Sequence, residues 1–274
     1  IYVPDRSRIL TVSRSASVGG AYSALTDALR AAQPGNIIEI ADNGSFSGGI
    51  VIGTNGQGLP LHGITIRAKS GFTPKIDGTG SSTADIRVVG LQNVLLQGLT
   101  ITGGQYGIQL TQPSTSIPLS ATIDKCTITR VADTSSSWGI VVDNGGMVQV
   151  TGSTISRCTG LGIGAFDGTR LTVSNSTLDS NGAGIEVAWI NVDAPKPNVQ
   201  ILGSTLSNNS GPGALLVYCS GTIDGSRFVR NRGTYGDGIE IVDGLLTITN
   251  NTWDTNDRNG IFFSSDTAVS GDPG

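Results

Sequence analysis

A short pattern of hydrophobic and polar residues recurs along most of the chain. In each copy a glycine precedes isoleucine, or once alanine, and opens an apolar segment, and successive copies start about 22 to 32 residues apart. The seven pairs are Gly107-Ile108, Gly139-Ile140, Gly162-Ile163, Gly184-Ile185, Gly213-Ala214, Gly238-Ile239 and Gly260-Ile261. Self-similarity at such a period indicates one structural unit stacked on itself, so the sequence predicts a repeat fold.

Each copy also contains a second segment, in which polar and apolar residues alternate. Six of these segments align without gaps, at residues 122–128, 149–155, 172–178, 200–206, 222–228 and 247–253. The alternation predicts a half-buried strand, a corner of one or two residues and a second short strand. Together with the glycine-isoleucine strand, each turn then holds three short strands, which is the arrangement of a parallel β-helix.

Asparagine is the commonest residue at one predicted corner of the turn. The six positions of this corner are Val131, Cys158, Asn181, Asn209, Asn231 and Asn256. Asparagine tolerates the left-handed backbone of a sharp corner, and its amide can bond to the next turn. We therefore expect an asparagine ladder.

The N-terminal region has a helical pattern instead. Apolar residues at Tyr22, Leu25, Leu29 and Ala32 recur at spacings of three and four, and Pro34-Gly35 follows as a terminator. A helix over about residues 21–32 is therefore predicted to cap the open end of the core. Strands are expected next, at residues 36–40, 50–52, 64–68 and 75–77.

These features resemble the right-handed parallel β-helix superfamily that contains pectate lyases, polygalacturonases and uronan epimerases. The resemblance covers essentially the whole chain and includes the order of the N-terminal segments AAQPGNIIEIADNG, ITIRA and KIDG. It implies an all-β, right-handed, single-stranded parallel β-helix of about nine turns with three strands per turn and a capping α-helix. It also implies an exported bacterial protein at an extracellular or cell-surface location.

One domain is expected over residues 1–274, with a cap at 1–36, β-helix turns at 37–263 and a tail at 264–274. The 40 glycines and the charged fraction of only 14% suit a solenoid with many corners. A net charge of -4 argues against nucleic acid as a partner, and no apolar run reaches the length of a membrane span. No helix is predicted to cover the last turn, so a further domain or a partner is expected at that end.

The cysteines and the histidine offer little chemistry. Cys126, Cys158 and Cys219 are predicted to be small buried residues without a disulfide, because Cys126 and Cys158 fall at different corners. His62 lies in an early loop, far along the axis from all three thiols. A catalytic thiol is therefore unsupported.

The superfamily resemblance directs attention first to acidic clusters. Members that attack polyuronates carry aspartate clusters with lysine or arginine on the second strand, but here that strand face has only Asp124 and Asp224. Four rungs separate them, or about 19 Å, which is too far for one carboxylate pair. This departure counts against a standard polygalacturonase or a calcium-dependent pectate lyase.

A better pair lies on the glycine-isoleucine strand. Its outward column contains Glu186 and Glu240, two rungs and therefore about 9–10 Å apart. That separation approaches the one at which one carboxylic acid protonates a leaving oxygen while the other activates water, with inversion. Two solvated acids on a strand face remain the alternative interpretation.

Two long connections fall at one corner, at residues 111–120 and 188–198, and a third excursion covers 230–237. Insertions in a repeat fold gather on the functional face, although loops also simply vary. A groove is therefore predicted with Glu186, Asp237 and Glu240 as catalytic residues. Its substrate-binding residues are predicted to be Trp189, Tyr218, Tyr235, Arg232 and Asp243.

No metal or cofactor is expected to be required. Ca²⁺ at the corners that begin with Asp143, Asp167 or Asp243 stays an open alternative, because aspartate-glycine pairs are also ordinary turn sequences.

Two functional hypotheses remain open. The chain is either a lyase, epimerase or glycosidase that binds and then cleaves or modifies an extracellular polysaccharide, or a non-catalytic structural, adhesive or glycan-binding module of a larger surface protein. Catalysis itself is undecided. The enzyme predicts that Glu186, Asp237 and Glu240 converge beside aromatic walls, and the module predicts no converging titratable groups. A polysaccharide or glycan is the expected partner.

Overall fold

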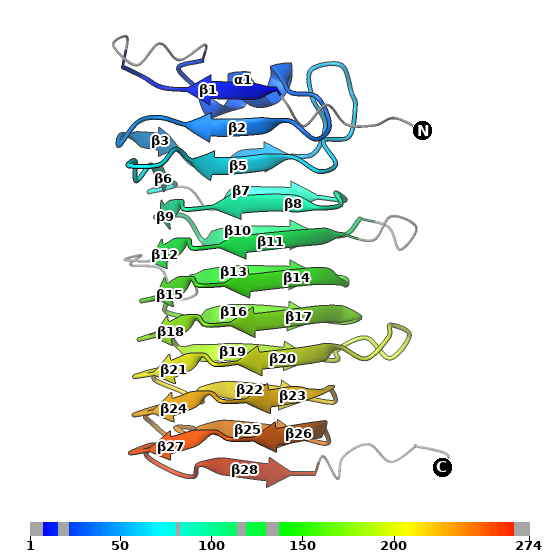
Figure 1. Cartoon of the computed structure of the whole chain (residues 1–274). Helices are drawn as coiled ribbons and strands as arrows, with labels where there is room; N and C mark the ends of the chain where they lie inside the picture. Colours follow the sequence, from blue (N-terminus) through cyan, green and yellow to red (C-terminus); the bar gives the residue numbers. More distant parts are fainter. Residues whose placement is uncertain (1–7, 16–21, 81–82, 114–118, 130–136, 266–274) are drawn as a thin grey trace.

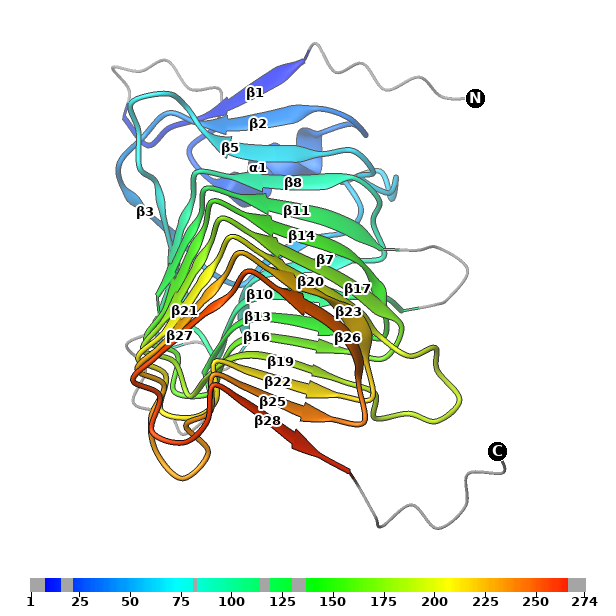
Figure 2. The ribbon, with the colours of Figure 1, turned by 60° about the horizontal axis from the view of Figure 1, so that its bottom comes forward.

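The chain winds around one axis to form an elongated β-helix, and its stacked strands make three parallel β-sheets (Figure 1). The computed structural model describes residues 8–15, 22–80, 83–113, 119–129, 137–265. Figure 2 shows the strands of successive turns stacked above one another around a common core. The predicted all-β fold of about nine turns with three strands per turn is confirmed.

Sheet A has ten strands and contains the alternating segments. Its strands are β1 (Ile9–Val12), β2 (Ile37–Ile40), β5 (Thr65–Ala68), β8 (Val94–Gln97), β11 (Ser120–Asp124), β14 (Gly146–Thr151), β17 (Thr169–Ser174), β20 (Asn198–Leu202), β23 (Ser220–Asp224) and β26 (Leu245–Thr249).

Sheet B has nine shorter strands. They are β3 (Ser45–Ser47), β6 (Lys75–Asp77), β9 (Thr100–Thr102), β12 (Thr127–Thr129), β15 (Thr154–Ser156), β18 (Thr177–Asp179), β21 (Thr205–Ser207), β24 (Arg227–Val229) and β27 (Thr252–Asp254).

Sheet C also has nine strands and contains the glycine-isoleucine segments. They are β4 (Ile50–Ile52), β7 (Ala84–Val89), β10 (Tyr106–Thr111), β13 (Trp138–Asp143), β16 (Leu161–Phe166), β19 (Ala183–Ala188), β22 (Ala214–Val217), β25 (Ile239–Val242) and β28 (Ile261–Ser264).

The N-terminal segment differs in detail from the prediction. Helix α1 (Leu25–Ala31) is shorter than expected, because Tyr22 forms a parallel bridge with Val12 instead of a helical turn. Leu25 and Leu29 are buried, as their spacing predicts. Strand β1 was not expected, and it adds one strand to sheet A before the helix.

Inward aliphatic side chains fill the core, and most of those between β2 and β25 are fully buried. The repeated glycines allow the turns to approach one another closely. A Cβ atom on Gly184 would collide with the backbone carbonyl oxygen of Gly213 on the next turn and would crowd the Asn209 amide at 3.2 Å. A Cβ would also collide with a backbone oxygen of the next turn at Gly139, Gly162, Gly213 and Gly238, so the stacking leaves no room for a side chain at these positions.

The asparagine ladder is present between sheets B and C. Backbone amides of Cys158, Asn181, Asn209 and Asn231 each donate to the side-chain oxygen of the asparagine one turn later, at 3.0–3.3 Å. Val131, the first predicted position, lies outside the described residues. A parallel row of serines joins sheets A and B, since the amides of Cys126, Ser153, Ser176 and Ser204 donate to the serine hydroxyl one turn later.

Candidate functional site

The outward side of sheet C carries the column of residues that the repeat predicts. Strand pairing places its members directly above one another, one per turn. The seven members that the repeat predicts are Gln109, Val141, Gly164, Glu186, Leu215, Glu240 and Phe262, and the structure adds Arg87 on β7 before them. We call this column and the outward residues beside it the sheet C face.

Glu186 and Glu240 stand on β19 and β25 with Leu215 between them. Two rungs separate their backbones, which is about 9–10 Å. Burial raises the pKa of Glu186, and both side chains are only partly exposed. Burial and the neighbouring Asp237 carboxylate raise the pKa of Glu240, and Arg258 partly offsets that rise. Both carboxyl groups thus hold a proton to higher pH than an ordinary glutamate does.

Asp237 lies at the beginning of the same strand, but its side chain is fully buried. One carboxylate oxygen accepts hydrogen bonds from the backbone and side-chain amides of Asn259 at 2.9 and 2.8 Å. The other lies 3.2 Å from the Arg258 guanidinium. Asp237 therefore joins two turns and influences Glu240 through its charge.

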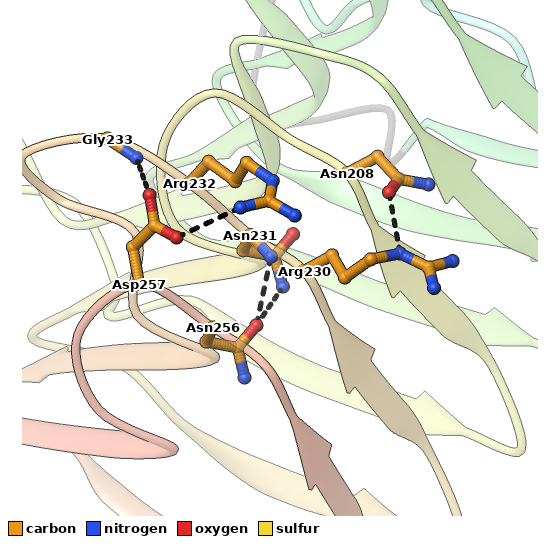
Figure 3. Close-up of polar contacts among 7 residues, drawn as sticks. All are labelled: Asn208, Arg230, Asn231, Arg232, Gly233, Asn256 and Asp257. Atoms are coloured by element: carbon orange, nitrogen blue, oxygen red, sulfur yellow. Dashed lines mark hydrogen bonds and ion pairs between the residues drawn. The ribbon is translucent and has the colours of Figure 1, made fainter.

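Arg232 and Tyr235 lie in the connection between sheets B and C, at the corner of the asparagine ladder. The Arg232 guanidinium donates to Asp257, whose second oxygen accepts from the amide of Gly233 (Figure 3). Tyr235 is exposed in the same connection. The structure places both residues at the edge of sheet C, before its strands begin.

Trp189, Tyr218 and Asp243 lie at the opposite edge, after the strands end. The Trp189 ring packs edge-on against Tyr218 at 6.1 Å, and the Lys196 ammonium lies 4.9 Å above it. The Trp189 indole nitrogen donates a hydrogen bond to the backbone oxygen of Ala194 at 2.8 Å. The predicted residues thus form three groups: two glutamates on the face and one group at each edge. The two edges are separated by the strand length of about 13–20 Å.

Three aromatic residues on the sheet C face were missed from the sequence. Tyr106, Trp138 and Phe166 stand on three consecutive strands, β10, β13 and β16. Trp138 packs against Tyr106 at 5.8 Å and against Phe166 at 6.1 Å. Gly160 leaves room for the indole, because a Cβ there would lie 2.5 Å from its nitrogen. The aromatic cluster ends one turn before Glu186. The available signal was an aromatic residue at the first position of β10 and of β13 and at the last position of β16.

A hollow of about 250 Å³ lies beside this cluster at the N-terminal half of the face. Its lining includes Val51, Arg87, Tyr106 and Gln109. Arg87 is exposed, and no hydrogen bond or ion pair of its guanidinium occurs among the described residues. Gln109 donates its amide to Asp143 at 3.1 Å. The hollow therefore offers a cation, an aromatic ring and an amide to a ligand.

The aspartates of the three candidate calcium corners differ in exposure, since Asp143 is partly exposed and Asp243 is exposed. Asp167 is buried, and one of its oxygens accepts from the backbone amides of Ile190 and Asn191 at 2.8 and 3.0 Å. Within the described part of the chain, no group of three His, Cys, Asp or Glu side chains could hold a metal ion. Nor does any helix in those residues have the length and apolar character to cross a membrane.

Comparisons with known proteins agree with this architecture. A sequence model of the family described as "Right handed beta helix region" matches residues 79–244. No curated protein matches the chain. Among solved structures, the pectate lyase Pel9A has a TM-score of 0.61 and 15% identity, with 86% of this chain and 68% of that chain covered.

The pectin methylesterase from Aspergillus niger has a TM-score of 0.59 and 14% identity, with 97% of this chain and 92% of that chain covered. The surface protein and adhesin PfbA of Streptococcus pneumoniae has a TM-score of 0.41 and 15% identity, with 82% and 76% covered. At these identities the first two similarities show the fold, and the third is too weak for any argument.

Proposed function

Because the chain belongs to the family of right-handed β-helix regions, we propose that its sheet C face binds an extracellular polysaccharide. The named activities of the two enzymes that share its fold, on pectate and pectin, support a carbohydrate ligand. An exported protein at the cell surface or outside the cell is part of the same proposal.

The observation that carries this proposal is the set of charged, amide and aromatic side chains that are spaced along the axis on the sheet C face. From Arg87 to Glu240 the column covers six rungs, or about 29 Å, and the aromatic cluster of Tyr106, Trp138 and Phe166 lies beside it. Aromatic surfaces with a few polar groups are typical of small-molecule binding sites. A site of this length, open along the axis, suits an extended polymer.

Binding can be measured by affinity electrophoresis against a panel of neutral and acidic polysaccharides. We expect Tyr106→Ala and Arg87→Ala to weaken binding at least tenfold. Arg227→Ala is the matched control, because Arg227 is exposed on sheet B, away from the face. Tyr235→Ala tests the sequence-based alternative at the edge of the sheet. Loss of binding in Tyr235→Ala, with Tyr106→Ala unchanged, would move the site to that edge.

Hydrolysis with inversion is a second candidate function, favoured by the two glutamates. Their separation of two rungs leaves room for a water molecule beside the sugar, and the raised pKa of Glu186 suits a general acid. Glu240, next to Arg258, is then the general base. Asp237 and Arg258 hold this end of the site through their ion pair.

Cleavage is tested by reducing-end release, with ultraviolet absorbance of unsaturated ends as the readout for a lyase. Glu186→Gln and Glu240→Gln are expected to abolish release of reducing ends and to keep binding. Products of inverted configuration by NMR support the assignment. Binding without products in any assay assigns the chain to the non-catalytic class, in which the face only holds the glycan.

A further inference from the structure

A second depression lies at the corner between sheets C and A, away from the sheet C face. Gln112 and Pro113, which follow β10, border it on one side, the connection from β19 to β20 borders it on the other, and two short corners between them form its floor. The ends of β10 and β19 are three rungs apart, or about 14 Å. Their cleft has a volume of about 770 Å³. We call it the corner cleft.

The connection from β19 to β20 is a preformed wall of the corner cleft, and Figure 1 shows it extending beyond the neighbouring corners. The buried Asp167 carboxylate accepts from two of its backbone amides, and the Gly168 amide donates to Pro195 at 2.6 Å. Within the same connection, the Trp189 indole nitrogen donates a hydrogen bond to the backbone oxygen of Ala194. Binding here therefore requires little ordering of this wall.

Apolar side chains are exposed at and around the corner cleft. Met147 on the floor is 53% exposed, while Ile190 and Val192 on the ordered connection are 70% and 77% exposed. Pro113 and Pro195 also line the cleft, and none of its described lining residues is aromatic. Exposed aliphatic residues and methionine on a rigid frame are typical of protein interaction sites.

The corner cleft contains one basic and one acidic side chain. Arg170 is exposed on the floor, and its guanidinium forms no hydrogen bond or ion pair among the described residues. Asp193 is exposed on the wall formed by the β19–β20 connection. Arginine forms paired hydrogen bonds with a carboxylate, and an aspartate favours a basic or amide donor.

From these features we infer that the corner cleft docks an extended segment of a partner protein. Along the axis the segment carries an aliphatic side chain for Met147, an acidic side chain for Arg170 on the next turn, and a basic or amide donor for Asp193 on the connection that follows. Recognition is separate from the glycan site, because different side chains form the two surfaces and the corner cleft lies beyond the ends of the sheet C strands, at the corner between sheets C and A.

The probe is a phage-displayed peptide library selected on the folded whole chain. We expect enrichment of peptides with an acidic residue next to an aliphatic one. Fluorescence polarisation of the selected peptide should show at least tenfold weaker binding to Arg170→Glu and to Met147→Asp. Replacing the peptide's acidic residue by lysine should restore binding to Arg170→Glu. Arg227→Glu is the matched control and should bind as the wild type does.

Three results would overturn the inference. The first is a selection that shows no enrichment over an empty surface. The second is a set of selected peptides that bind Arg170→Glu as well as the wild type. The third is loss of polysaccharide binding in Arg170→Glu and Met147→Asp, which would make the cleft part of the glycan site. Circular dichroism of each variant confirms the fold, and unchanged polysaccharide binding in both variants separates this test from that of the proposed function.

Discussion

The Asp237 carboxylate and the Arg258 guanidinium lie 3.2 Å apart on adjacent turns, next to Glu240. The aspartate is fully buried, whereas the arginine side chain is 34% exposed. The charges of Asp237 and Arg258 therefore influence the pKa of Glu240 in a partly desolvated environment, in which electrostatic interactions are stronger than in water.

Arg258→Gln should raise the pKa of Glu240 further. The substitution removes the positive charge that lowers this pKa and leaves the effects of burial and Asp237 in place. A carboxyl group with a raised folded-state pKa stabilises the fold below its unfolded pKa, and that contribution is lost as pH rises through the folded pKa. The free energy of unfolding of the variant should therefore fall between about pH 4.5 and the new pKa.

Carbon-13 NMR titration of the glutamate carboxyl groups measures this shift. If Glu240 is the general base, the acidic limb of the pH–rate profile should move upward by the same amount. Arg232→Gln is the control, because Arg232 pairs with the exposed Asp257 and should change stability by less than about 1 kcal/mol. An unchanged titration in Arg258→Gln would contradict the assigned coupling.

Asn231→Leu should destabilise the fold by about 2–4 kcal/mol. The buried amide donates to the Leu206 carbonyl at 3.2 Å and to Asn256 at 3.0 Å, and its oxygen accepts from Asn209 at 2.8 Å. Leucine leaves these buried groups without partners. Urea unfolding measures the change, and Gln200→Leu, an exposed amide on sheet A, should have a small effect. Equal effects of the two substitutions would contradict a stabilising ladder.

Gly184→Ala should destabilise the fold by about 1–3 kcal/mol, because the added methyl group meets the backbone of the next turn. Gly53→Ala is the matched control. A Cβ at Gly53 has no neighbour within 4 Å, so its effect should stay below about 1 kcal/mol. Thermal unfolding of the two variants compares them, and a lower midpoint for Gly53→Ala would refute the steric explanation.

The cysteine thiols should be inert in the folded protein. All three are free and buried, and burial raises the pKa of Cys126 and of Cys219 to about 12. Since the thiolate is the reactive species, a thiol reagent at neutral pH should label the native chain only as fast as it unfolds. Rapid labelling of any cysteine before denaturant is added would show that its site opens.

The fold was predictable because stacking imposes one constraint on every turn. The alternation around Ile123, Val150 and Val173 sets which side chains enter the core, and the recurring glycine sets where turns touch. The column of Glu186, Leu215 and Glu240 followed directly from the spacing. Helix α1 was predicted too long, because the spacing of Tyr22 and Leu25 does not reveal the bridge between Tyr22 and Val12.

The candidate site was harder to predict, since corners vary in length and their side chains have no repeat to fix them. Sequence proximity to Glu240 suggested a groove with Arg232 and Tyr235, but the backbone turns the corner before the strand begins. Trp189 is engaged by its own connection, through Ala194 and Lys196. The aromatic cluster depends on the room left by Gly160, which only the three-dimensional packing shows.

The stacking of whole turns limits how the glutamate pair can change over generations. Gain or loss of one complete repeat between Glu186 and Glu240 alters their distance by a single rung of about 4.8 Å, while the remaining repeats keep their own contacts. Intermediate distances are inaccessible to the backbone. The distance between the two carboxyl groups can therefore evolve only in steps of whole rungs, or by exchange of the side chains themselves.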